Sequence, residues 1–190
     1  KLKKKKPKWV FFSSTSHVYK ITKKKVKIRE NTKLFPSSKY GLSKKKAEFE
    51  ILKLKNFKIN FCIGRIFSFT DLNQKTPYVI PSIIKKNKFS KKKEIKLKNL
   101  NHFRDFISTK QITEIIEKLY KTNSSGVYNI GSGKGMNIKK IAEFIGKKYK
   151  KKIIFDDNKE ITYLISNNKK ILKKGIKFKK SFNNLDFLYK

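Results

Sequence analysis

Residues 9–19, WVFFSSTSHVY, join a wholly apolar run to a cluster of hydroxyl-bearing side chains. The run WVFF, residues 9–12, is apolar on both faces, which is typical of a parallel β-strand buried inside an α/β protein. The cluster SSTS, residues 13–16, follows directly, so we expect this strand to stop at a polar edge. Ligands of α/β proteins bind at the carboxyl ends of strands, and this edge is therefore a candidate site.

The stretch PSSKYGLSKKKAEFE, residues 36–50, predicts a helix that starts near Pro36 and continues to about residue 55. Tyr40 and Lys44 are four residues apart, so both side chains project from one face of that helix. A nearby ammonium favours the phenolate and lowers the pKa of a tyrosine from about 10, which suits acid–base chemistry. Alone the pair is weak evidence, because 51 of the 190 residues are lysine or arginine.

The rest of the chain shows alternating strand and helix patterns, which indicate an α/β fold. Residues 20–35 are lysine-rich and aperiodic, so we expect a loop there. Helices are expected at 76–87, 109–121 and 137–150, the last capped by Asn137. Strands are expected at 59–67, 94–100 and 126–130, with a short extended piece at 104–108 and a last strand at 151–157.

The composition limits the class of protein. The chain has the length of one domain or slightly more, and hydrophobic residues at 37% make it too apolar for a disordered chain. A formal net charge of +38 would normally suggest a nucleic-acid partner. However, the lysines run through every segment, and the codons of a low-GC genome explain them more simply. The arginines, which phosphate readers prefer, are only Arg29, Arg65 and Arg104.

We therefore expect no nucleic-acid partner, although a lysine-rich remnant that binds polyanions remains the alternative. The single Cys62 excludes an internal disulfide and fits a reducing cytoplasm, and its thiol is expected in the core. With only two histidines, no metal site is expected. No apolar run approaches the roughly 20 residues of a membrane span, so no membrane partner is expected.

Residues 10–19 and 36–48 together resemble the extended short-chain dehydrogenase/reductase family, which includes NAD-dependent nucleotide-sugar epimerases, dehydratases and reductases. That family carries Ser-Ser-Ser/Thr and Val-Tyr after a strand, and then Pro-x-x-x-Tyr-Gly-x-Ser-Lys-x-x-x-Glu. The matching positions are Ser13, Ser14, Thr15, Val18, Tyr19, Pro36, Tyr40, Gly41, Ser43, Lys44 and Glu48.

The resemblance implies roles for these side chains. Thr15 would hydrogen-bond the sugar hydroxyl or ketone that reacts, and Tyr40 would be the acid/base residue. Lys44 would bind the nicotinamide ribose and lower the pKa of the tyrosine, and Tyr40 and Ser13 would also contact the cofactor. A hydride needs a nicotinamide acceptor or donor, so NAD or NADP is the expected cofactor.

Three further blocks extend the resemblance over roughly residues 8 to 155. Residues 64–86 resemble the Arg-x-Phe-Asn…Phe-Val-x-Pro segment of the family, most closely that of GDP-4-keto-6-deoxymannose reductases. Residues 99–116 match a block in which Arg104 would pair with the diphosphate of a nucleotide-diphosphate sugar. Residues 124–145 match the small substrate domain.

The sequence departs from the family pattern at three places. These departures change the substrate contacts that we expect, but they do not change the family that the sequence resembles. Ser68, an expected substrate contact, replaces an asparagine that often touches sugar or cofactor. Asp71 replaces a glycine, and residues 109–111 replace Val-Asp-Asp.

The expected fold is the C-terminal portion of a Rossmann-like doubly wound parallel sheet plus a small α/β substrate domain. Residues 1–80 would form the partial Rossmann-like domain, with the catalytic strand and the Tyr–Lys helix. Residues 81–190 would form mainly the substrate-binding domain, with segments near 101–120 returning to the first part. Several family enzymes dimerise through the helix of the Tyr–Lys pair, so a homodimer is possible by resemblance.

The segment GSGKGMN, residues 131–137, lies between a strand and a helix, as a dinucleotide fingerprint does. Met136 occupies the third glycine position, so we expect a structural turn. The fingerprint itself is expected in βα units upstream of residue 9, which this sequence does not contain. The sequence is therefore expected to be the C-terminal part of such an enzyme, with little or no activity for residues 1–190 alone.

Among the reactions of the family, a 4-ketoreductase is the first hypothesis, and a C4 epimerase or 4,6-dehydratase is the alternative. A dehydratase usually has an acidic residue beside the catalytic hydroxyl, where this chain has Ser16 and His17. His17 and His102 are expected to be loop residues, with His17 close enough to touch substrate. Arg65 would either hold the loop that closes the site or touch substrate. The sugar, the nucleotide and the choice between NAD and NADP stay open.

Overall fold

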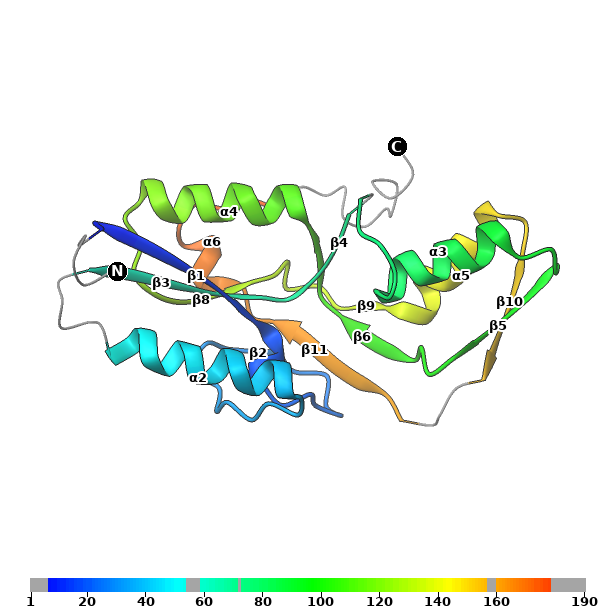
Figure 1. The fold of residues 1–190 in the computed structure, drawn as a ribbon, viewed down its shortest axis with the longest axis horizontal. Coiled ribbons are helices and arrows are strands. Elements are labelled where there is room, and N and C mark those ends of the chain that lie inside the picture. Colours follow the sequence, from blue (N-terminus) through cyan, green and yellow to red (C-terminus); the bar gives the residue numbers. More distant parts are fainter. Residues whose placement is uncertain (1–6, 54–58, 72, 157–159, 179–190) are drawn as a thin grey trace.

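The first sheet of the molecule has three parallel strands in the order β1–β3–β8, formed by Trp9–Thr15, Asn60–Ile66 and Gly126–Ile130. Helices α2 (Lys39–Lys53) and α4 (Thr109–Lys121) lie on opposite sides of this sheet (Figure 1). The predicted α/β fold is therefore confirmed. The computed structural model describes residues 7–53, 59–71, 73–156 and 160–178.

The ends of β1 and α2 differ from the sequence expectation. Strand β1 continues to Thr15, so the first three residues of the hydroxyl cluster end the strand instead of following it, and Ser16 begins the next turn. Helix α2 starts at Lys39, three residues after Pro36, and the Ser38 hydroxyl oxygen accepts a hydrogen bond from the Gly41 N–H. That bond satisfies one of the amide groups that every helix start leaves without an intrahelical partner. Residues 54–55 of the predicted helix lie outside the described residues.

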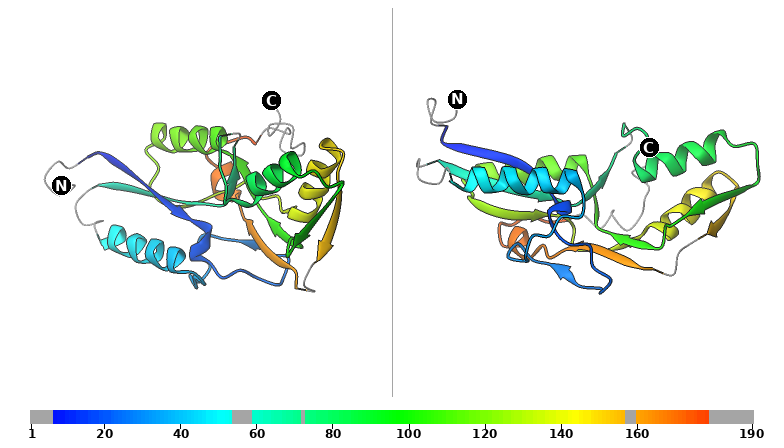
Figure 2. Two further views of the ribbon diagram at one scale, coloured as in Figure 1. Left: turned by 45° about the vertical axis from the view of Figure 1, so that its right-hand side comes forward. Right: turned by 60° about the horizontal axis from the view of Figure 1, so that its bottom comes forward.

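A second group of elements packs around its own core at the other end of the molecule (Figures 1 and 2). Strand β5 (Glu94–Lys98) pairs in parallel with β10 (Lys152–Asp156), and the predicted alternation holds because Ile95 and Leu97 point inward. Helices α3 (Val79–Phe89) and α5 (Ile138–Lys148) pack against each other in the same hydrophobic cluster. The Asn137 side chain caps α5 as predicted, since it accepts a hydrogen bond from the Lys139 N–H.

A four-stranded sheet in the order β2–β11–β6–β9 joins the two groups. The strand expected at 151–157 is present as β10, with residue 157 outside the described residues, but the expectation that it is the last strand is wrong, because β11 follows it with a neighbour on either side. The expected loop at 20–35 also contains a strand, which is too short to produce a periodic pattern of its own. The four strands are Lys27–Ile28 (β2), His102–Arg104 (β6), Met136–Asn137 (β9) and Thr162–Ser166 (β11).

His102 is therefore a strand residue and not the loop residue that we expected. A further parallel pair joins β4 (Ser68–Thr70) to β7 (Phe106–Ser108), and the short helix α6 (Lys169–Leu172) follows β11.

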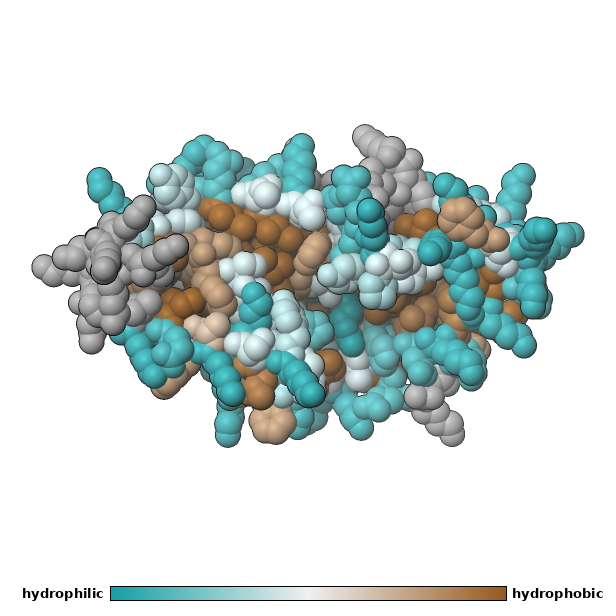
Figure 3. Space-filling view, in the orientation of Figure 1, coloured by the Kyte–Doolittle hydropathy of each residue, from teal (hydrophilic) through white to brown (hydrophobic). Residues whose placement is uncertain are grey.

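Hydrophobic residues are gathered over the first sheet between α2 and α4, whereas hydrophilic residues cover much of the remaining visible face (Figure 3). Cys62 is fully buried in β3 as expected, and burial raises the pKa of its thiol to about 12. None of the helices in the described ranges is long and apolar enough to cross a membrane.

Candidate active site

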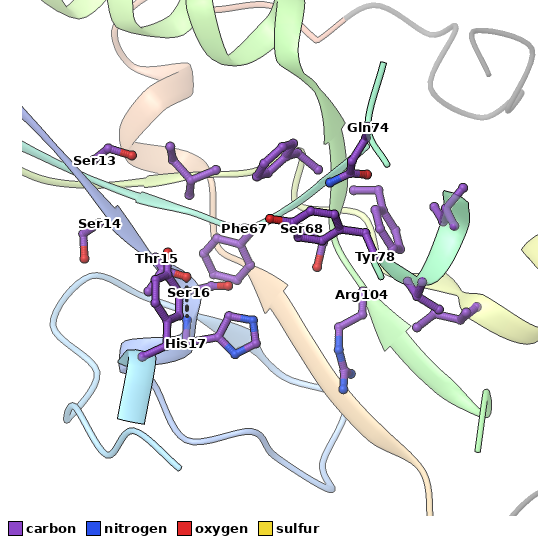
Figure 4. A pocket seen from close by; sticks show the side chains of 17 residues that line it. Ser13, Ser14, Thr15, Ser16, His17, Phe67, Ser68, Gln74, Tyr78 and Arg104 are labelled. Carbon is purple, nitrogen blue, oxygen red and sulfur yellow. Dashed lines mark hydrogen bonds between the residues drawn. The ribbon is translucent and has the colours of Figure 1, made fainter. Parts of the chain in front are cut away.

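A cleft of about 580 Å³ opens at the carboxyl end of β1, where β3, β4, β6 and α3 approach it (Figure 4). Most of the side chains that the sequence singled out line this cleft, although they come from four separate segments of the chain. The lining includes Ser13, Thr15, Tyr40, Ser68 and Arg104.

The Tyr–Lys pair lies at the start of α2, beside the end of β1. Tyr40 lines the cleft and its side chain is 54% exposed. The Lys44 Nζ lies 5.9 Å from the centre of the Tyr40 ring, and it donates a 2.8 Å hydrogen bond to the backbone carbonyl of Ser13. The helical spacing therefore brings the ammonium beside the phenol ring, as the sequence predicted, although Lys44 is not among the residues that line the cleft.

Thr15 is the last residue of β1 and also caps a short 3₁₀ turn, Ser16–Val18. Its Oγ1 accepts a 3.3 Å hydrogen bond from the backbone N–H of His17. Because Thr15 ends β1 and lines the cleft, its hydroxyl is held at the strand edge where ligands of α/β proteins bind.

Arg104 reaches the cleft from β6, on the opposite wall (Figure 4). Its Nη1 donates to the carbonyl oxygens of Phe103 and Thr162 at 2.9 and 3.2 Å, and its Nη2 donates to the Thr162 Oγ1 at 3.0 Å. The two bonds to Thr162 follow from the β6–β11 pairing, so the guanidinium position depends in part on a strand that the sequence did not reveal. Burial lowers the pKa of Arg104, although a guanidinium remains charged near neutral pH.

His17 lies in the same cleft, in the 3₁₀ turn after Thr15. Its ring meets the ring of Tyr40 edge-on, with centroids 6.3 Å apart. Partial burial lowers the pKa of His17, and the positive charge of Arg104 lowers it further. The sequence offered one signal for this residue, its position two residues after the expected catalytic hydroxyl.

A buried polar network supports the cleft from behind. The Arg65 Nη2 pairs with the Glu48 Oε2 at 2.7 Å, and the Ser14 hydroxyl donates to the same carboxylate. Arg65 also donates to the Tyr19 hydroxyl and to the Glu30 carbonyl, at 2.7 and 2.8 Å. Arg65 is 4% exposed and holds the loop at Glu30, which agrees with the first of the two roles considered for it.

Tyr19 and Glu48, which carry part of the family resemblance, therefore belong to this buried network and have a structural role. The Tyr19 hydroxyl donates to the Asn129 Oδ1 at 2.7 Å, and burial raises the pKa of Tyr19 to about 12, so this phenol stays neutral. Sequence reasoning did not identify this network, because its partners are up to 110 residues apart along the chain.

The glycine turn after β8 surrounds a protein carboxylate. Asp105 is fully buried and accepts hydrogen bonds from the N–H groups of Ser132 and Gly133, at 2.9 and 3.0 Å, and from the N–H of Ser166 at 3.1 Å. The hydroxyl groups of Ser132 and Ser166 donate to it as well. Burial raises the pKa of Asp105, and these hydrogen bonds oppose that effect. The predicted structural turn is confirmed, since its amide groups bind Asp105.

Two of the departures from the family pattern lie together in space. The Thr109 hydroxyl donates a hydrogen bond to the Asp71 carboxylate, and this bond lowers the pKa of Asp71. Thr109 follows β7 and Asp71 follows β4, so the bond joins the ends of two paired strands. Within the described ranges, the His, Cys, Asp and Glu side chains form no group of three or more that could hold a metal ion.

The fold and the cleft together define a Rossmann-like α/β protein with a Tyr–Lys helix packed on one side of its parallel sheet. The family model for GDP-mannose 4,6 dehydratase matches residues 1–184, and the chain belongs to this family. No curated protein sequence matches the chain.

Several solved structures share this fold. UDP-N-acetylglucosamine 4-epimerase from Methanobrevibacter ruminantium M1, in complex with UDP-N-acetylmuramic acid, matches with a TM-score of 0.82 and 22% identity, over 98% of this chain and 63% of that one. RMD from Pseudomonas aeruginosa, complexed with NADPH, matches with a TM-score of 0.77 and 19% identity, over 87% of this chain and 59% of that one. The structure of dTDP-glucose 4,6-dehydratase from Bacillus anthracis, in complex with NAD, matches with a TM-score of 0.76 and 22% identity, over 87% of this chain and 54% of that one. The chain spans less than two thirds of the length of each.

Proposed function

We propose that this chain carries the acid–base residues and the substrate side of an NAD(P)-dependent enzyme that modifies nucleotide sugars. The observation that carries the proposal is the cleft in which Thr15, Tyr40 and Arg104 converge from separate segments. Family membership and the NAD- or NADPH-bound structures of similar fold support it.

In this proposal, Tyr40 exchanges a proton with the oxygen at the reacting sugar carbon, and Thr15 hydrogen-bonds that oxygen. The Lys44 ammonium, 5.9 Å from the centre of the Tyr40 ring, binds the nicotinamide ribose. Ser68 contacts the sugar. Arg104, whose charge is permanent, pairs with the diphosphate.

The residues present fit the nicotinamide end of a dinucleotide, which would supply hydride transfer when bound. Ser13, Tyr40 and Lys44 lie together at the end of β1, where they can hold that end. The glycine turn at 131–133 does not fit the pyrophosphate, because its amide groups already bind Asp105. We therefore place only the nicotinamide contacts in this chain.

For the reaction, we favour reduction of a 4-keto sugar, because the pattern of residues 64–86 resembles that of GDP-4-keto-6-deoxymannose reductases. A 4,6-dehydratase is the second candidate, which the family model favours. Against it, Ser16 and His17 stand beside Thr15 where a dehydratase usually has a carboxylate. A C4 epimerase uses the same Tyr40 and Thr15 chemistry and is the third candidate.

The same proposal divides the chain at about residue 80. Residues 1–80 carry the cofactor side and 81–190 mainly the substrate side, with segments near 101–120 returning to the first sheet. A cytoplasmic location and a homodimer formed through α2 belong to this proposal.

Calorimetric titration with GDP-mannose tests the site. We expect saturable binding that weakens about 10- to 100-fold in Arg104→Ala, because a charge-assisted contact to the diphosphate is lost. Arg29→Ala is the matched control, since it removes the same charge from an exposed position away from the cleft. Equal effects of the two variants would contradict the proposal. Steeply salt-dependent DNA binding without any response to GDP-mannose would favour the polyanion-binding remnant instead.

A further inference from the structure

His17 occupies a position in the cleft that the proposed roles do not use. It neighbours Tyr40, whose ring it meets edge-on at 6.3 Å between centroids, and its pKa responds to the charge of Arg104. In Figure 4 its imidazole lies between Thr15 and the Arg104 guanidinium. The other histidine, His102, hydrogen-bonds the Thr162 Oγ1 through Nδ1 and is not among the residues that line the cleft.

The backbone around His17 is held tightly in place. Its N–H donates to Thr15 Oγ1, and the Tyr19 N–H closes the turn on the Ser16 carbonyl at 3.1 Å. Helix α2 packs directly against this turn, since a Cβ on Gly41 would come within 2.3 Å of the His17 carbonyl oxygen. The absence of a side chain at Gly41 therefore permits the contact that fixes His17 beside Tyr40.

The surroundings of the imidazole favour its neutral form. The other charged or titratable side chains that line the cleft are Tyr40 of α2, Tyr78, and Arg104 of β6, and none of the described residues lining it is an aspartate or glutamate. His17 is exposed to solvent at the cleft, and its partial desolvation together with the charge of Arg104 lowers its pKa below the ordinary value of 6.5. A neutral imidazole offers one donor and one acceptor, as a sugar hydroxyl does.

We propose that His17 is a substrate-contacting residue that hydrogen-bonds a hydroxyl of the sugar in a bound nucleotide sugar. The inference rests on the proposed function, which places the reacting sugar carbon at Tyr40 and the diphosphate at Arg104. A sugar between those two groups lies beside the His17 ring, which neighbours both. The contact would help the cleft to distinguish a nucleotide sugar from the free nucleotide.

The test compares the affinities for GDP-mannose and GDP at about pH 8, where the imidazole is neutral. We expect His17→Ala to weaken GDP-mannose binding about 3- to 10-fold, the usual effect of one neutral hydrogen bond, and to change GDP binding by less than about 2-fold. His17→Gln keeps a donor and an acceptor, so it should retain more of the affinity. His102→Ala is the matched control, and any effect of it through Thr162 and Arg104 should be the same for both ligands.

A second readout uses the unmutated chain. Its two histidines give separate imidazole NMR signals, which the His17 and His102 variants assign. We expect GDP-mannose to shift the His17 signal more than GDP does, and the His17 signal of the free chain to titrate with a midpoint below 6.5. If GDP-mannose and GDP both bind and shift the His17 signal equally, the inference about His17 is wrong, whereas the proposed function stands. Binding of neither ligand would overturn the proposed function and the inference with it.

Discussion

At the scale of single residues, one face of α2 serves both the cleft and the core. Tyr40, Lys44 and Glu48 are spaced by four residues, so they follow one another along that face. The first two lie beside the cleft, whereas Glu48 is buried against Arg65 of β3. The acidic residue that ends the family motif therefore positions the helix that carries the Tyr–Lys pair.

Glu48→Gln is expected to destabilise the chain by about 3–5 kcal/mol, because it leaves the buried Arg65 charge without its partner. Urea unfolding measures this difference. The control is Glu50→Gln on the same helix, whose exposed pair with Lys53 should contribute less than about 1 kcal/mol. Similar costs for the two variants would show that Arg65 does not depend on Glu48.

At the scale of elements, Asp105 ties three strands together. It immediately precedes β7, and it accepts hydrogen bonds from the turn after β8 and from Ser166 at the end of β11. One carboxylate thus satisfies amide groups from segments that are 27 and 61 residues away. Since an unsatisfied buried amide is costly, this arrangement stabilises the junction between the first sheet and the four-stranded sheet.

Asp105→Asn is expected to lower the free energy of unfolding by about 3 kcal/mol. The amide brings donors of its own into a site where the neighbouring groups are already donors, so some of them lose their acceptor. Thermal and urea unfolding both report this loss. Asp156→Asn removes the same charge from an exposed pair with Lys98 and should cost less than about 1 kcal/mol. A stable Asp105→Asn variant would be evidence that the junction is held by other contacts.

At the scale of the whole molecule, the charge of +38 opposes folding. The chain has 51 basic and 13 acidic residues, so most lysines cannot have an acidic partner. Self-repulsion of this kind favours expanded states and is weakened by salt. The alternating strands and helices nevertheless bury enough apolar surface for three hydrophobic clusters among the described residues, one in each group of elements and a third that includes residues of β2 and β11.

Raising NaCl from about 0.02 M to about 0.3 M should therefore raise the Tm of the chain, by about 3 °C for each kcal/mol of repulsion that is screened. Differential scanning calorimetry measures the shift. KCl at equal ionic strength should give the same result, because screening depends on ionic strength and not on the cation. A Tm that falls or stays constant as salt increases would contradict a dominant role for self-repulsion.

The sequence by itself determined the local features of this protein and its family. The strands near residues 9–15 and 60–66 and the helices α2, α4 and α5 follow from apolar periodicity and capping residues within short windows. The Tyr40–Lys44 arrangement follows from helix geometry alone, since two residues four apart share a face. These features need no information about distant parts of the chain.

Only the tertiary structure decided how distant segments meet. Strand β11 gains its neighbours from β2 and β6, and the same pairing aims Arg104 into the cleft. The burial of Glu48 against Arg65, and the place of His17 between Tyr40 and Arg104, depend on contacts across the sheet. The physical reason is that periodicity reports which face of an element is buried but not which partner covers it. Partners that are tens of residues apart are selected by the packing of the whole fold.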